Sequence, residues 1–129
     1  MIMREEEEYK REVTVIMTER DNKRLLEIYR RGEEKETLSE RALINVYERV
    51  KFALSASSLM YDTKEVPEIE DRIRFFFEEY YFDNVPESST SDIRYYITAF
   101  KRFFLILEKE GEIDRGRLSS LYSLLSEYL

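Results

Sequence analysis

The sequence predicts an all-α fold, a single compact bundle of five to six helices. Apolar residues recur every three to four positions along most of the chain, which is the period of an amphipathic helix. Only three glycines and two prolines interrupt the 129 residues, too few for the many turns of a β-sandwich or barrel. The connections between the periodic segments are short, so we expect one helical domain over residues 1–129.

The N-terminal third predicts two helical segments. Residues 1–12 are mostly charged, which fits either a frayed helix or a disordered arm. The first apolar stripe at helical spacing then comprises Tyr9, Val13, Ile16 and Met17. A second stripe begins at Leu25 in a different phase, so we expect a kink or a short break near Thr18. Gly32 is expected to end the second segment as the residue after its C-cap.

Local signals set the remaining boundaries. Proline is favoured in the first turn of a helix, glycine just after the last turn, and serine, threonine or aspartate at the N-cap. The predicted elements are a central helix from Thr37 to about Tyr61, a helix from Pro67 that stops before Pro86, a helix from about Ser89 to Gly111, and a last helix beginning near Asp114.

Composition excludes several kinds of site. The chain has no cysteine, which excludes disulfides, zinc–thiolate centres and thiol nucleophiles. It has no histidine, which removes the commonest general base and the commonest transition-metal ligand. We therefore expect a protein that is not an enzyme and that holds no cofactor and no metal.

The N-terminus, MIMREEEE, is acidic and lacks the apolar run of a secretory signal. The longest apolar stretches are far too short to cross a bilayer, so we expect a cytoplasmic protein without a membrane partner. Arginine is twice as common as lysine, and glutamate is abundant. This usage suggests a source organism from a hot environment.

Charge is distributed unevenly. The formal net charge is −7, and residues 67–87 hold seven acidic side chains against two basic ones. An acidic chain lacks the broad cationic surface that non-specific nucleic-acid binding needs, so nucleic acid is disfavoured as a partner.

A local basic patch is still the second hypothesis. Such a patch would contact phosphates or an acidic partner, or it would pair with the chain's own carboxylates. Its candidate residues are Arg20, Lys23, Arg24, Arg31, Lys101 and Arg102.

Ten tyrosines and eight phenylalanines are more than one small core needs. Tyrosine is favoured at contact sites because it buries a large area at a low cost in conformational entropy. The candidate interface residues are Tyr80, Tyr81, Phe82, Tyr95 and Tyr96. The alternative is that these tyrosines lie at the margin of the core with their hydroxyl groups in water.

Two weaker patterns resemble known families. Glu68 and Asp71, with Glu33 and Glu36, are similar to the carboxylate pairs that hold magnesium in the all-α nucleotide pyrophosphohydrolases. The simpler interpretation of these carboxylates is a solvated acidic face. The segment FFLILEKEGEIDRGRLSSLYSLL resembles the first two helices of a winged helix. It also resembles a helix–Gly–helix segment in the core-binding domains of tyrosine recombinases. No recognition helix follows it before Leu129, so we expect a helical hairpin that closes the bundle.

From these patterns we expect a small non-enzymatic module or accessory subunit that binds another protein or a copy of itself. The alternative is a nucleic-acid-associated regulator that uses the basic patch.

Overall fold

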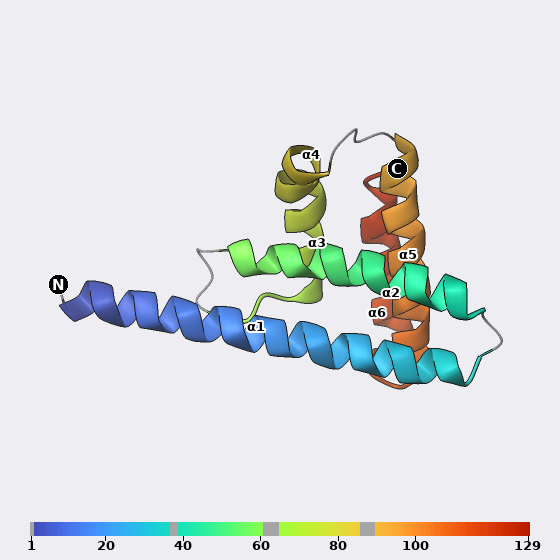
Figure 1. Ribbon diagram of the computed structural model, residues 1–129, viewed down its shortest axis with the longest axis horizontal. Helices are drawn as coiled ribbons and strands as arrows, with labels where there is room; N and C mark the ends of the chain where they lie inside the picture. The colour runs from blue at the N-terminus through green and yellow to red at the C-terminus, as the bar shows by residue number, and fades with distance from the viewer. Residues whose placement is uncertain (1, 37–38, 61–64, 86–89) are drawn as a thin grey trace.

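The computed structural model describes residues 2–36, 39–60, 65–85 and 90–129. Within these ranges it contains no strand, and five helices pack together, which confirms the predicted all-α fold (Figure 1). The elements are α1 (Ile2–Glu34), α2 (Glu40–Ser55) extended by the short 3-10 helix η1 (Ala56–Leu59), α3 (Ile69–Phe75) continued by the π-helical turn η2 (Phe76–Tyr80) and α4 (Tyr81–Asn84), α5 (Thr90–Lys109) and α6 (Arg115–Ser126).

Helix α1 is continuous over 33 residues, so the predicted break near Thr18 is wrong. Thr18 lies inside the helix, and its hydroxyl donates to the carbonyl of Thr14, one turn earlier, at 2.8 Å. Thr14, Thr18 and Asn22 are buried and form the core-facing row of this half of α1. The apolar stripe changes phase because it changes sides of one helix, from the outer face at Ile16 to the inner face at Leu25.

Gly32 lies inside α1 rather than after its end, so its predicted role as a C-terminal stop is also wrong. A Cβ atom at this position would overlap the side chain of Ile106 on α5 and would lie 3.0 Å from Glu110 Cγ. Gly32 therefore permits a close crossing of α1 and α5.

Helix α2 packs against both α1 and α5, which confirms its predicted central position (Figure 1). Ser39 caps it, accepting a hydrogen bond from the backbone N–H of Ala42 at 3.2 Å. The predicted cap, Thr37, lies outside the described residues. The α-helix ends at Ser55, earlier than predicted, and η1 follows it.

Local capping rules hold at the C-terminal hairpin. Gly111 follows α5 with φ = 81°, a conformation that glycine adopts without strain. Asp114 caps α6, accepting from the backbone N–H of Arg117 at 2.7 Å. The expectation that Pro67 opens the next helix is wrong by two residues, because Glu68 occupies the N-cap and α3 begins at Ile69.

Aromatic side chains from α2, η2, α4 and α5 form much of the core. Phe76 is fully buried and contacts the rings of Phe52, Tyr81 and Tyr96 with centroid distances of 5.0 to 6.2 Å.

Among the described helices, none is long and apolar enough to cross a membrane.

Candidate functional site

The outer face of the N-terminal half of α1 exposes large apolar side chains. Tyr9 is 68% exposed, Ile16 48% and Met17 51%. Tyr9 and the buried Thr18 are nine residues apart, about two and a half turns, so they point to opposite sides of the helix. The exposed apolar residues therefore lie on the side that faces away from the protein's own core. We call Tyr9, Val13, Ile16 and Met17 the α1 outer stripe.

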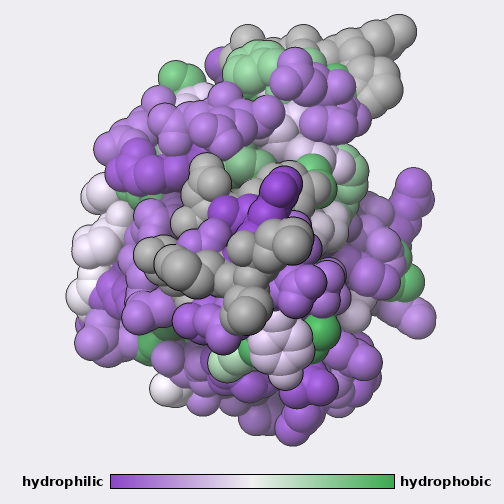
Figure 2. All heavy atoms as spheres, turned by 90° about the vertical axis from the view of Figure 1, so that its left-hand side faces the viewer, coloured by the Kyte–Doolittle hydropathy of each residue, from purple (hydrophilic) through white to green (hydrophobic). Residues whose placement is uncertain are grey.

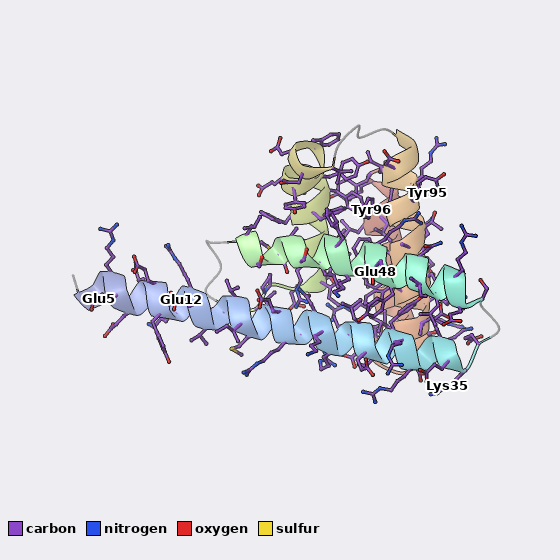
Figure 3. All side chains as sticks on the ribbon, viewed as in Figure 1. Glu5, Glu12, Lys35, Glu48, Tyr95 and Tyr96 are labelled. Atoms are coloured by element: carbon purple, nitrogen blue, oxygen red, sulfur yellow. The ribbon has the colours of Figure 1, made fainter. Side chains whose placement is uncertain are left out.

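The first three turns of α1 extend beyond the rest of the bundle (Figure 1). Every residue from Arg4 to Glu12 is exposed. Figure 3 shows Glu5 and Glu12 on this projecting arm, away from the other helices. Seen from the end at which the arm points outward, the surface is mainly hydrophilic with small separate hydrophobic areas (Figure 2). The arm therefore holds Tyr9 on a part of α1 that is exposed all round, whereas Val13, Ile16 and Met17 lie where the opposite side of α1 packs on the bundle through Thr14 and Thr18.

Charged residues flank the stripe at both ends. Glu5 and Glu6 precede it, and Arg20 and Lys23 follow it, all exposed. None of these four forms an ion pair with another described residue. The stripe thus lies between an acidic end and a basic end, and in a protein contact such charges set the orientation of the partners more than their affinity.

A groove of about 550 Å³ lies beside the basic end of the stripe, between residues 17–24 of α1 and the segment 66–68. Arg72 forms part of its wall and is only 3% exposed. Its guanidinium donates to Asp21 Oδ2 at 2.7 Å, to Asn22 Oδ1 at 2.7 Å and to the Pro67 carbonyl at 2.9 Å.

This network determines the charge of the groove wall. Burial raises the pKa of Asp21, but hydrogen bonds from Arg72 and Arg24 outweigh it and hold that pKa below its usual value. Asp21 is therefore a carboxylate at neutral pH. Its ion pair with Arg72 fixes α1 against the start of α3, and with it the position of the groove.

The five aromatic residues predicted as an interface are not one surface. Tyr81 is fully buried, and Tyr80 and Tyr96 are partly buried against Phe76. These three belong to the core or its margin, as in the alternative interpretation of the sequence, in which the tyrosines lie at the margin of the core. Phe82 and Tyr95 stay 64% and 54% exposed, and the guanidinium of Arg49 stacks over the Tyr95 ring at 4.9 Å.

The six basic residues predicted as one patch do not form one surface either. Arg20 and Lys23 are free of described ion pairs, whereas Arg24 pairs with Asp21 and Glu112, and Arg31 with Glu27. Lys101 lies on α5, far along the chain from the α1 residues, and its ammonium group is near the ring of Tyr122 on α6.

Arg102 is bound within the protein by the buried carboxylate of Glu33, at 2.6 and 3.0 Å. The Tyr29 hydroxyl donates to the same carboxylate at 2.6 Å. Burial raises the pKa of Glu33, but the bonds from Arg102 and Tyr29 outweigh it and leave that pKa below its usual value. Arg102 therefore has a structural partner and is not presented to a ligand.

The carboxylates that resemble a magnesium site do not assemble. Glu33 is buried at the end of α1, Glu36 pairs with Lys109, and Glu68 pairs with Arg117. In the part of the chain that the structure describes, no group of three or more metal-ligating side chains gathers.

Comparisons with protein-family models, with curated protein sequences and with solved structures found no match to this chain.

The sequence shows the outer stripe only as apolar residues at helical spacing, and that spacing does not tell whether the stripe faces the core. The signal that could have decided this is the row Thr14, Thr18 and Asn22, spaced four residues apart on the opposite side. Small polar residues repeated at that spacing are compatible with a close helix contact through hydrogen bonds, which leaves the apolar side outward.

Proposed function

We propose that this protein is a non-enzymatic protein–protein interaction module and that the outer stripe of α1 is its binding surface. The observation that supports this most is the exposure of Tyr9, Ile16 and Met17 on one side of a regular helix, opposite its buried side. Large exposed apolar side chains that share one side of a helix, with charged residues at both ends, offer a partner an apolar surface to cover.

The stripe is suited to binding because it is already ordered. Residues 2–34 form one helix whose second half is fixed in the bundle by Leu25, Tyr29 and the close approach at Gly32. A partner helix would meet a preformed surface, so little conformational entropy would be lost on association. Tyrosine and methionine are also enriched in the central parts of protein interfaces.

The nucleic-acid alternative has less support. A phosphate-binding surface needs several unpaired cations on one face. Of the six basic residues singled out from sequence, Arg24, Arg31 and Arg102 are bound to carboxylates of the same chain. Only the neighbours Arg20 and Lys23 remain together and without a described ion pair, and the stripe beside them is apolar rather than basic.

The test is a capture experiment from extract of the native cells with three tagged baits: the wild type, Ile16→Asp and Ile44→Asp. Ile16 and Ile44 are both 48% exposed, but Ile44 lies on α2, away from the stripe. We expect a protein that the wild type and Ile44→Asp retain and that Ile16→Asp loses. If all three baits retain the same proteins, the α1 outer stripe is not the binding surface.

A further inference from the structure

We propose that the occupant of the α1 outer stripe is a second copy of this chain, whose own α1 lies antiparallel along it. This inference rests on the proposed function and names the partner. Three features of α1 lead to it: the spacing of the residues on the outer face, the order of charges along that face, and the position of the groove beside its basic end.

The outer face has the spacing of a helix–helix seam. Residues 6, 9, 13, 16, 20 and 23 alternate at intervals of three and four, as the core positions of a two-stranded coiled coil do. In order they are Glu6, Tyr9, Val13, Ile16, Arg20 and Lys23, all on the side away from the buried row. The apolar residues are central and the charged ones terminal, over about 26 Å of helix at 1.5 Å per residue.

The charges select the antiparallel orientation. When two copies are aligned antiparallel about a point between residues 14 and 15, Val13 meets Ile16 of the second copy. Tyr9 then meets its Arg20, and Glu6 meets its Lys23. By two-fold symmetry each contact occurs twice, and every layer is apolar, cation–aromatic or oppositely charged.

The same residues make a parallel arrangement of the two helices unfavourable. It would place Glu6 against Glu6, Arg20 against Arg20 and Lys23 against Lys23, three like-charged layers out of six. Like charges at a contact are destabilising, so the sequence of the seam itself distinguishes the two orientations.

The charged residues of the seam are available to a partner. Glu6, Arg20 and Lys23 have no ion pair with a described residue, although Arg24, Arg30 and Arg31 nearby on the same helix all have one. The projecting arm, residues 4–12, would extend along residues 17–24 of the second copy, beside its groove. One contact is unfavourable in this register: Glu12 lies next to Glu19 of the second copy, both on the same flank of the seam.

The experiment is sedimentation equilibrium of the full chain over a wide range of concentration. We expect a monomer–dimer equilibrium whose dissociation constant rises at least about 30-fold in Ile16→Asp, since two isoleucines leave the interface. The matched variant Ile44→Asp should change it less than about 2-fold. Far-UV circular dichroism checks that all variants keep the wild-type helix content.

Charge reversal tests the register. Glu6→Lys and Lys23→Glu should each raise the dissociation constant about 5-fold, and the double variant should return it to within about 2-fold of the wild type. Glu12→Gln should tighten the dimer by relieving the contact with Glu19. Asp83→Lys controls for net charge, because Asp83 is exposed on α4 and the change in charge equals that of Glu6→Lys.

A protein that stays monomeric at every concentration overturns the proposal, as does an additive loss of affinity in the double charge variant. If the monomeric protein still captures another protein through Ile16, the interaction module stands and only the identity of its partner is wrong.

Discussion

Replacing Gly32 by alanine tests whether α1 and α5 cross as closely as the structure shows. On an exposed helix, glycine to alanine stabilises by about 1 kcal/mol, because alanine restricts the unfolded chain and favours the helix. At Gly32 the new methyl group would overlap Ile106, a residue that is only 1% exposed, and would lie 3.0 Å from Glu110 Cγ. Glu110 can swing into solvent, but Ile106 has no such freedom.

Overpacking of a core by one methyl group costs about 1–3 kcal/mol. The overlap with Ile106 is severe and places the cost in the upper part of this range, about 2–3 kcal/mol. Offset by about 1 kcal/mol for the helix preference of alanine, Gly32→Ala should destabilise the fold by about 1–2 kcal/mol and lower the melting temperature by roughly 4–8 °C for a chain of this size. The assay is urea unfolding followed by circular dichroism at one fixed protein concentration, since association would shift the midpoint.

Two comparisons isolate the cause. Gly116→Ala, in the first turn of α6, places its Cβ 3.5 Å from Asp114 Oδ1, an ordinary contact, and should stabilise by about 0.5–1 kcal/mol. In an Ile106→Ala background the overlap disappears, so Gly32→Ala should become neutral or stabilising. A Gly32→Ala protein that is more stable than the wild type would refute the close crossing.

Three other substitutions test the buried polar contacts and the hairpin. Glu33→Gln should cost about 2 kcal/mol at pH 7 by removing the charge bonded to Arg102 and Tyr29. The pKa of Glu33 is lower in the folded protein than in the unfolded chain, so the stability difference between the wild type and Glu33→Gln should be full above about pH 5. It should vanish as the pH falls through the lowered pKa. Unfolding measured from pH 7 to 2 tests this, and a stability difference that stays constant over that range would contradict it. Arg72→Lys keeps the charge, but a lysine cannot donate to Asp21, Asn22 and the Pro67 carbonyl at the same time. Urea unfolding should therefore show that the free energy of unfolding falls by about 3 kcal/mol. A decrease below about 0.5 kcal/mol would exclude a structural role for the Arg72 network. Gly111→Ala should cost about 1 kcal/mol in the same assay because φ is 81°, and no loss would mean that the turn adopts another conformation.

The fold class was predictable because its signals are local. Periodicity identified the helices, Asp114 marked the start of α6, and Gly111 marked the end of α5. Each depends on residues within one turn of the position concerned, so the sequence alone contains the information.

The errors occur where the decisive contact is distant in sequence. The side chain of Asn22 donates to the carbonyl of Leu54 at 3.1 Å, 32 residues away, and this helps to turn the polar side of α1 inward. Gly32 is required by Ile106 on another helix, and nothing near Gly32 in the sequence shows it.

The candidate site was only partly predictable for the same reason. Periodicity detects that Tyr9, Val13 and Ile16 share a side of a helix, but it does not show whether that side faces the core. The aromatic residues near the end of α3 were misjudged because the π-helical turn Phe76–Tyr80 changes the phase of the helix, which puts Tyr81 inside and Phe82 outside.

The most direct measurement of the antiparallel contact is the distance between spin labels on two copies of the protein. The chain has no cysteine, so a single cysteine placed at Glu12 or at Arg31 labels one site per copy. In the antiparallel arrangement the two Glu12 positions lie about 8 Å apart along the helix axis and the two Arg31 positions about 50 Å apart, at 1.5 Å per residue. A short distance at residue 12 with a long one at residue 31 is the predicted result. Equal distances at both positions, or no distance between copies at either, would contradict it.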